Sequence, residues 1–336
     1  MTGTLAASTI HFSNMNFKNL IPTAFYIPLG MCALVAMPNW ADAHGFAGDR
    51  FFPATISTDD PFAASELSLP TISAIRQPGG SGPVKDINIS ADLSVLVLPR
   101  TAVTIGDGYQ IVKPANQRAL TGFDNLTANV LFEFYENDPH ELITSVGLTW
   151  EIGGTGRRSL GASSFSTFTP TFYVGKGLGD LPSSLPWLRP IALTGEVGLS
   201  IPSRAGDRSV SFDTATGRNQ VTITPNPDLI QWGIAVEYSL IYLQEHVKDI
   251  GLRAPFDRLI PLVEFAMHTP VNRLIGPTTG TVNPGIIWSG QYSQFGVEAV
   301  IPVNSHTGNN VGVVAQLHFY LDDILPKVFS KPLINP

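Results

Sequence analysis

Apolar and polar residues alternate one by one along most of the chain after residue 70. The alternation is clearest in 126–134, 230–240 and 311–321, where every second residue is apolar. Because successive side chains of a β-strand point to opposite faces, this period of two predicts strands with one apolar face. The predicted strands are 71–77, 84–98, 101–112, 122–136, 141–152, 164–176, 187–201, 228–243, 257–268, 283–290, 293–302 and 310–321.

The length of these stretches and the composition of their polar face favour a membrane barrel. Strands of soluble proteins usually have about 5–6 residues, whereas alternating segments of about ten, joined by turns, are typical of transmembrane barrels. The polar face carries small, hydrophilic residues rather than lysine, which suits an enclosed lumen. We therefore predict an all-β protein, a transmembrane antiparallel β-barrel of about 12 strands. A soluble β-sandwich is the alternative.

The predicted connections alternate in length along the chain. Short turns such as 99–100, 136–140 and 291–292 alternate with loops that include the long segments 202–227 and 269–282. Outer-membrane barrels have their short turns in the periplasm and their long loops outside. Both termini are therefore expected in the periplasm.

This topology divides the chain after the leader into an irregular segment (44–70), the barrel (71–321) and a periplasmic tail (322–336). Within the longest loop, 209–212 and 220–224 are expected to form an extra hairpin above the membrane.

The first 43 residues are typical of a signal peptide. Lys18 precedes the apolar run 20–37, and Ala41-Asp42-Ala43 supplies the small residues of a cleavage site after Ala43. A transmembrane anchor and a lipoprotein signal at Cys32 are the alternatives, and the prolines of the run and its small-residue exit favour cleavage. The only cysteine leaves with the signal, so the mature chain is expected to have no disulfide.

Composition excludes several classes of protein. With 43% hydrophobic and 14% charged residues the chain is neither disordered nor highly solvated, and its net charge of −7 argues against nucleic-acid binding. After residue 43 no apolar run is long enough for a helical span. We expect the outer membrane of a Gram-negative cell, with outer-membrane lipid, the barrel-assembly machinery and a small-molecule cargo as partners.

Acidic residues recur on the polar face of the predicted strands. Together with one histidine they are expected to line the lumen: Asp92, Glu133, Glu151, Glu196, Glu237, Glu264, Glu298 and His318. An acidic ring of this kind favours cations or polar cargo. Alternatively, the carboxylates fill a lumen too narrow for a pore and are hydrogen-bonded to basic residues near strand ends: Lys176, Arg189 and Arg258. Both interpretations stay open.

Two catalytic hypotheses compete with a channel. His44, N-terminal after cleavage, would offer an amine and an imidazole to Cu(II), and AHGF resembles the start of copper-dependent polysaccharide monooxygenases. That chemistry needs a second histidine from the set His140, His246, His268, His306 and His318.

A lipid hydrolase would instead pair a serine with a histidine, for which His318, His268 and Ser239 are candidates. No motif surrounds these residues, and G-x-S-x-G, H-E-x-x-H and C-x-x-C are absent. We therefore predict no enzyme, no catalytic residue, no metal and no cofactor.

Aromatic residues recur near the predicted strand ends. They are Trp150, Trp187, Trp232, Trp288, Tyr135, Tyr242 and Tyr292. Amphipathic rings in such places form the interfacial girdles of membrane barrels. Core packing in a sandwich is the alternative.

Several segments resemble the outer-membrane "meta-pathway of phenol degradation" transporters, which are distantly like long-chain fatty acid channels. They are GGTG (153–156), FSTFTPTFYVGKGLGDLP (165–182), WLRP (187–190) and AQLHFYLDD (315–323). The resemblance covers about residues 66–325 and implies passive uptake of small, weakly polar or apolar compounds. One departure is the Pro-rich tail 324–336, because barrels of this compartment usually end on an aromatic residue. A barrel enzyme acting on lipid and a structural barrel with a blocked lumen are the alternatives.

The irregular segment 44–70 is expected to plug the barrel. Its large apolar side chains are Phe46, Phe51, Phe52, Phe62 and Leu67. Their burial is favourable by about 25 cal/mol per Å², and the lumen is the nearest sheltered site. Three aspartates would need partners or water there, which predicts a segment half inserted and half at the mouth. A poorly ordered leader is the alternative.

The barrel prediction is tested by fractionation and a heat-modifiability gel. A folded membrane barrel is expected in the outer-membrane fraction and shifts in mobility when boiled. Recovery in the soluble periplasm with no shift would remove the barrel interpretation.

Overall fold

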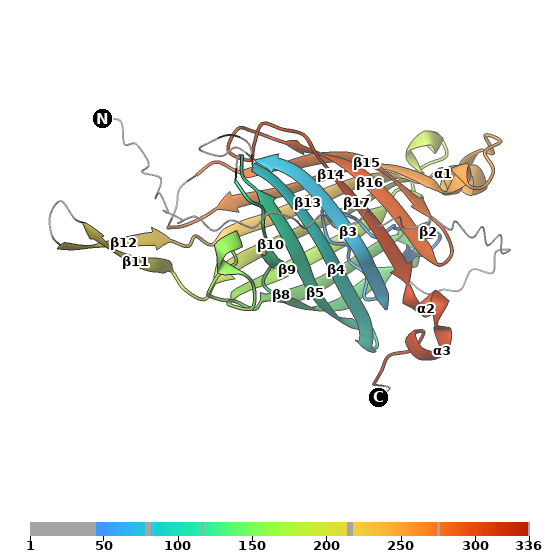
Figure 1. Ribbon diagram of the computed structural model, residues 1–336. Coiled ribbons are helices and arrows are strands. Elements are labelled where there is room, and N and C mark those ends of the chain that lie inside the picture. Colours follow the sequence, from blue (N-terminus) through green and yellow to red (C-terminus); the bar gives the residue numbers. More distant parts are fainter. Residues whose placement is uncertain are drawn as a thin grey trace, which may run out of the picture. The chain divides into compact units, whose positions relative to one another are not determined.

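Twelve antiparallel strands close into a barrel within the residues that the computed structural model describes. Figure 1 shows this barrel from the side. The described residues are 45–77, 82, 84–115, 117–213, 218–273 and 276–334. The expected signal peptide and His44 lie outside them. The predicted fold class is therefore confirmed.

The barrel strands follow one another in sequence. They are β3 (Glu66–Gln77), β4 (Val84–Leu98), β5 (Thr101–Lys113), β6 (Leu120–Phe123) with β7 (Thr127–Asn137), β8 (Leu142–Glu151), β9 (Thr167–Gly177), β10 (Ile191–Pro202), β13 (Leu229–Tyr238), β14 (Leu259–Pro270), β15 (Thr279–Ser289), β16 (Ser293–Pro302) and β17 (Gly312–Tyr320).

Strand pairing explains how the barrel closes. Each strand pairs with its sequence neighbours, and β17 pairs with β3, so no edge stays open. Short β6 and β7 pair with different halves of β5 and together serve as one interrupted strand. Between β10 and β13 the chain forms the separate hairpin β11 (Gly206–Asp213) and β12 (Arg218–Pro225), where an extra hairpin was predicted.

The two faces of the strands differ as the alternation predicts. Outward side chains such as Ile105, Val197 and Phe295 are 54%, 50% and 49% exposed, although they are large and apolar. Inward positions on the same strands carry small or polar residues such as Thr104 and Glu196. An apolar exterior around a polar interior is the pattern of outer-membrane-type barrels. No described helix is long and apolar enough to cross a membrane.

Two strand ends differ from the prediction for local reasons. Strand β3 begins at Glu66 rather than 71, because a register shift between Ser68 and Thr71 interrupts its alternation. Strand β13 ends at Tyr238 rather than 243. There the hydroxyl of Ser239 accepts the Tyr242 N–H at 3.2 Å and caps the helical turn α1 (Leu240–Tyr242).

Two further bounds shift where turns intervene, and a third strand is longer than predicted. A 3₁₀ turn (Pro186–Leu188) occupies the predicted start of β10, and an interruption at 124–126 divides the strand predicted at 122–136. Strand β15 starts at Thr279, ahead of the predicted 283. Proline at the first helical position explains the 3₁₀ turn.

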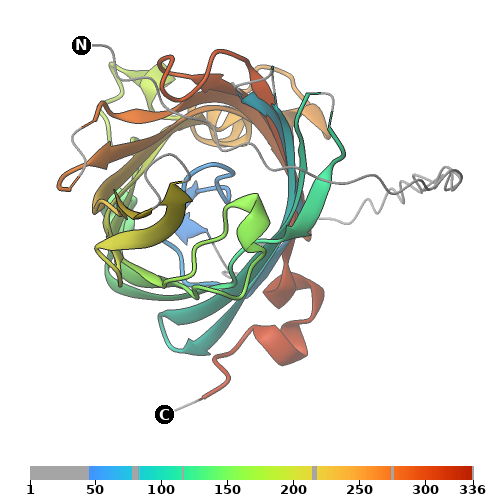
Figure 2. The same ribbon diagram turned by 60° about the vertical axis from the view of Figure 1, so that its left-hand side comes forward.

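The chain before β3 lies inside the barrel. The short strands β1 (Phe46–Ala47) and β2 (Arg50–Phe51) pair with each other, and Figure 2 shows them within the ring of barrel strands. We name residues 45–65 the lumen segment.

After β17 the chain leaves the barrel as two helical turns, α2 (Leu321–Ile324) and α3 (Pro326–Phe329). The tail then turns back to β4, because the N–H groups of Leu333 and Ile334 donate to the carbonyls of Leu96 and Val97 at 3.0 and 2.9 Å.

Most of the expected girdle aromatics lie on the outside of the barrel. Trp150, Trp187, Tyr135 and Tyr292 are large exposed residues. Tyr242 differs from the prediction, because it lies in the helical turn after β13 and is buried.

Replacement of Val197 by arginine tests the lipid-facing exterior. Val197 lies between Phe172 and Trp232 of the neighbouring strands on the outer face. A charge there is expected to cost about 2–4 kcal/mol of unfolding free energy, measured by equilibrium refolding in lipid vesicles. Val210→Arg is the control, since Val210 lies exposed on the β11–β12 hairpin, outside the barrel. Equal costs for both variants would contradict a lipid-facing exterior.

Candidate functional site

All eight residues predicted to line the lumen lie at inward positions of the barrel strands. They are Asp92 on β4, Glu133 on β7, Glu151 on β8, Glu196 on β10, Glu237 on β13, Glu264 on β14, Glu298 on β16 and His318 on β17. The period of two puts them on the same face as small residues. The structure separates them into groups with different partners.

Glu264 holds a turn of the lumen segment through both carboxylate oxygens. Its Oε1 accepts the Ile56 N–H at 2.8 Å, and its Oε2 accepts the N–H groups of Ser57 and Thr58 at 2.8 and 2.7 Å. The Thr58 hydroxyl adds a fourth bond at 2.9 Å. The neighbouring Glu298 accepts the Ser57 hydroxyl at 2.8 Å.

These hydrogen bonds compensate the free-energy cost of burying the Glu264 carboxylate. Glu264 is fully buried, and removing a carboxylate from water costs several kcal/mol. Hydrogen bonds to a charged group contribute about 1.5–3 kcal/mol each. Four such bonds compensate the buried carboxylate, so Glu264 favours the state in which the lumen segment is inserted.

Further lumen side chains bind the backbone of the lumen segment. Glu133 accepts the Ala63 N–H at 2.5 Å, and Gln294 donates to the Ala54 carbonyl at 2.5 Å. Two serine hydroxyls also donate to backbone carbonyls: Ser94 to Ala64 and Ser145 to Pro61. The lumen segment is thus bonded to strands on several sides of the barrel.

A buried arginine fixes the lumen segment at the short-turn end of the barrel. Arg50 donates to Glu141 at 3.2 Å and to the Pro190 carbonyl at 3.1 Å, and it also donates to the Arg189 carbonyl. Its guanidinium lies 3.5 Å from the centre of the Tyr242 ring. Burial lowers the pKa of Arg50, and the charge of Glu141 opposes that shift.

Glu141 is shared by three elements. Besides Arg50, it accepts the Gly179 N–H at 2.9 Å and the Tyr242 hydroxyl at 3.0 Å. A Cβ on Gly177 or Gly179 would lie 2.0 or 2.1 Å from its carboxylate oxygens. These two glycines are therefore required for the close approach of the β9–β10 turn to Glu141.

Apolar contacts reinforce the same end of the lumen. Phe52 is 2% exposed and packs with Phe62 at a centroid distance of 5.4 Å, against Ile143 and Ala192 of the wall. Phe51 and Ile56 pack against a second cluster on the wall: Ile260, Leu262 and Ile287. The phenylalanines singled out in the sequence are thus shielded at the positions where the lumen is apolar.

The basic residues expected near the acidic ring have other partners. Lys176 forms an ion pair with Asp180 at 3.0 Å, and Arg189 donates to the Gly179 carbonyl at 2.8 Å. Arg258 lies in a 3₁₀ turn before β14.

The remaining glutamates of the ring differ in whether their carboxylates have hydrogen-bond partners. Both carboxylate oxygens of Glu237 are buried without a hydrogen-bond partner among the described residues. Glu151 accepts from Asn125 at 2.7 Å. Glu196 borders a small cavity of about 210 Å³ with His268 and Thr58.

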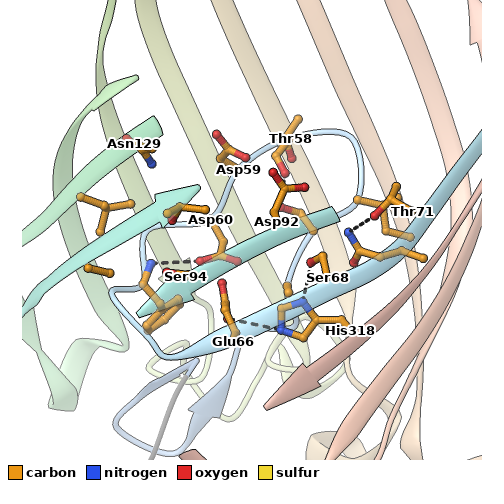
Figure 3. A pocket seen from close by; sticks show the side chains of 18 of the residues that line it. Thr58, Asp59, Asp60, Glu66, Ser68, Thr71, Asp92, Ser94, Asn129 and His318 are labelled. Carbon is orange, nitrogen blue, oxygen red and sulfur yellow. Dashed lines mark hydrogen bonds and ion pairs between the residues drawn. The ribbon is translucent and has the colours of Figure 1, made fainter. Parts of the chain in front are cut away.

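A larger cavity lies between the lumen segment and the wall formed by β3, β4, β5, β7, β8 and β17. Its volume is about 300 Å³. Figure 3 shows Asp59, Asp60, Glu66 and Asp92 grouped around it with His318. The ring of His318 bonds the Ser68 hydroxyl through Nδ1 at 2.9 Å and lies 3.3 Å from Glu66 through Nε2.

Ser68, His318 and Glu66 lie in the order of a serine–histidine–acid hydrolase triad. The other side chains of the cavity are unfavourable for that chemistry. Acyl transfer builds negative charge on the substrate oxygen, which needs donors aimed at it. Here Asp59, Asp60 and Asp92 bring more negative charge to the same cavity. Among the described residues no group of three His, Cys, Asp or Glu could hold a metal ion.

No protein-family profile matches the sequence, and no curated protein matches it. The solved structures similar to this chain include autotransporter barrels. The translocator domain of NalP from Neisseria meningitidis is 10% identical over 76% of this chain and 88% of its own, with a TM-score of 0.44. The transport unit of AIDA-I from Escherichia coli is 12% identical over 76% and 90%, with the same TM-score. Membership in the phenol-degradation transporter family stays a prediction.

Sequence reasoning missed the Arg50–Glu141–Tyr242 group. Arg50 lies in a segment without a period, and Glu141 lies in the turn directly before β8. One sequence signal could have indicated this group: Arg50 stands directly before Phe51 and Phe52 in a segment expected to be buried. A buried charge needs a partner of opposite charge.

Replacement of Arg50 by methionine tests the attachment of the lumen segment. The variant leaves Glu141 buried without its cation, a loss worth about 3–5 kcal/mol. Proteases are too large to enter the lumen, so cleavage requires the segment to leave. We expect chymotrypsin to cut at Phe51 and Phe52 about 100-fold faster or more than in the wild type.

Arg253→Met is the control, because Arg253 pairs with Asp249 on the exposed surface. It should leave the cleavage rate unchanged. Equal protection in the Arg50 and Arg253 variants would show that Arg50 does not hold the lumen segment.

Proposed function

We propose that this protein is an outer-membrane channel for the passive uptake of small molecules, with the lumen segment as its gate. The observation that carries the proposal is the way the lumen segment is held. It occupies the lumen through hydrogen bonds and one ion pair to the wall, and it is not itself a strand of the barrel.

Such an attachment suits a part that moves. Exchange of a neutral hydrogen bond for one with water costs a net of about 0.5–1.5 kcal/mol, and of a hydrogen bond to a charged group about 1.5–3 kcal/mol. The strand ladder contains none of the bonds that hold the lumen segment, so the ladder can stay intact when the segment leaves. The barrel needs no contact from the lumen segment to satisfy its backbone, because every strand pairs on both sides. Displacement of the segment would then open a polar path.

The lining of the lumen favours polar cargo. The cavity beside the lumen segment is bordered by carboxylates and by hydroxyl groups, among them Thr71, Ser90 and Thr104. An apolar molecule would gain little there and would leave these groups without water. Small polar compounds therefore suit the gate better than the weakly polar or apolar compounds that the family resemblance implies.

The Ser68–His318 pair supports a barrel enzyme as the competing function. The acidic cavity weighs against it, since the anionic transition state of acyl transfer would form among carboxylates. The proposal therefore assigns these two residues to the hydrogen-bonded wall of the lumen.

Deletion of residues 46–64 tests the gate in planar bilayers. The variant keeps Ser65, whose hydroxyl and carbonyl bond to Leu96 and Leu321 of the barrel and tail. Single-channel conductance is expected to rise several-fold, from brief small openings to a steady level. Unchanged conductance in a variant that still shows the mobility shift on boiling would refute the gate.

A reversible lock provides the matched control for this deletion. A Cβ at Gly233 would lie 2.5 Å from Cγ2 of Thr58, so cysteines at these two positions are close enough for a disulfide after small adjustments. The double variant Thr58→Cys, Gly233→Cys should stay closed when oxidised and should recover its openings with reductant. No other thiol is expected in the mature chain, because Cys32, the only cysteine of the sequence, lies in the expected signal peptide.

A further inference from the structure

The cavity between the lumen segment and the wall has an unbalanced charge. Four carboxylates border it: Asp59, Asp60, Glu66 and Asp92. Neither lysine nor arginine is among its lining residues, and its only nitrogen base is His318, which is bonded to Ser68 and faces Glu66. Burial and the neighbouring Glu66 raise the pKa of Asp60 well above its usual value, and a cation in the cavity would oppose that shift and favour the ionised carboxylate.

Acceptor atoms at the cavity wall lack donors. Gln316 is 7% exposed and borders the cavity; its amide nitrogen donates to Thr71 at 3.2 Å, whereas its buried Oε1 has no hydrogen-bond partner among the described residues. Asp92 lies over Gly106, where a Cβ would be 2.0 Å from its Oδ1. The glycine thus leaves room for a carboxylate at the wall, and no described side chain donates to it.

We propose that this cavity binds a small organic cation carrying several N–H donors, such as a diamine. This inference rests on the proposed function and names the substrate class of the same lumen. An ammonium group supplies both the positive charge that Asp59, Asp60 and Asp92 lack among the lining residues and the donors that Gln316 and Asp92 lack.

The shape of the cavity separates an organic cation from a metal ion. The carboxylates lie around the walls of a space of about 300 Å³, which is near the lower limit of small-molecule sites. A metal ion needs several oxygens within about 2.6 Å, and no three described acidic or histidine side chains converge in that way. An extended diamine reaches separate carboxylates with its two ends.

Isothermal titration calorimetry of the mature protein, folded in detergent at low salt with the lumen segment in place, tests the site. Putrescine is the probe, and calcium chloride and glucose are the comparison ligands. We expect saturable binding of putrescine and none of the other two. Asp92→Asn should weaken putrescine about tenfold, and Gln316→Leu, which keeps every charge, about threefold.

Asp86→Asn is the matched control, because Asp86 faces the lumen from the same strand as Asp92 but does not border this cavity. It should change the affinity less than twofold. Absence of saturable putrescine binding, equal binding of calcium or glucose, or equal losses in the Asp86 and Asp92 variants would each overturn the site. The assay needs no transport, so a failed gate in the conductance experiment and a failed site in calorimetry are distinguishable.

Discussion

The interior of this protein depends on the hydrogen bonds between Glu264 and the lumen segment. The carboxylate of Glu264 is fully buried in the wall and accepts three successive N–H groups of the chain that precedes the barrel. A barrel whose inner face carries so many acids cannot remain dry without donors. The lumen segment supplies them from its own backbone. Its extended, irregular course leaves N–H groups free for the wall, which a helix would have used internally.

The same requirement explains the division of the lumen along its length. At the short-turn end, Arg50 of the lumen segment binds Glu141 and two backbone carbonyls of the wall. Phe52 packs against apolar side chains of the wall at the same end. Farther along, the wall carries mostly acids, hydroxyls and amides, and the lumen segment faces them with a turn of backbone donors and with Asp59 and Asp60. The first region holds the segment, and the second leaves space for a ligand.

Most of the wall could be predicted from the sequence, because a period of two determines both strand and face. Strands β4 and β16 have the predicted bounds to the residue, although the pairing of β4 with β5 shifts register between Leu96 and Leu98, close to the end of the strand. The bounds of β3 and β13 could not be found in this way, because a bulge and a capping serine interrupt the period there.

The partners of the lumen residues lay beyond any local pattern. Arg50 and Glu141 are 91 residues apart, and Ile56 and Glu264 are 208 apart, so their contact exists only after the barrel has closed around the segment. Hydrogen exchange at the amides of Ile56, Ser57 and Thr58 in the folded protein is the most direct test. The account predicts protection far above that of an unstructured chain but below that of the barrel strands, because the segment can leave while the strands stay paired; exchange at the rate of an unstructured chain, while the strands stay protected, would contradict it.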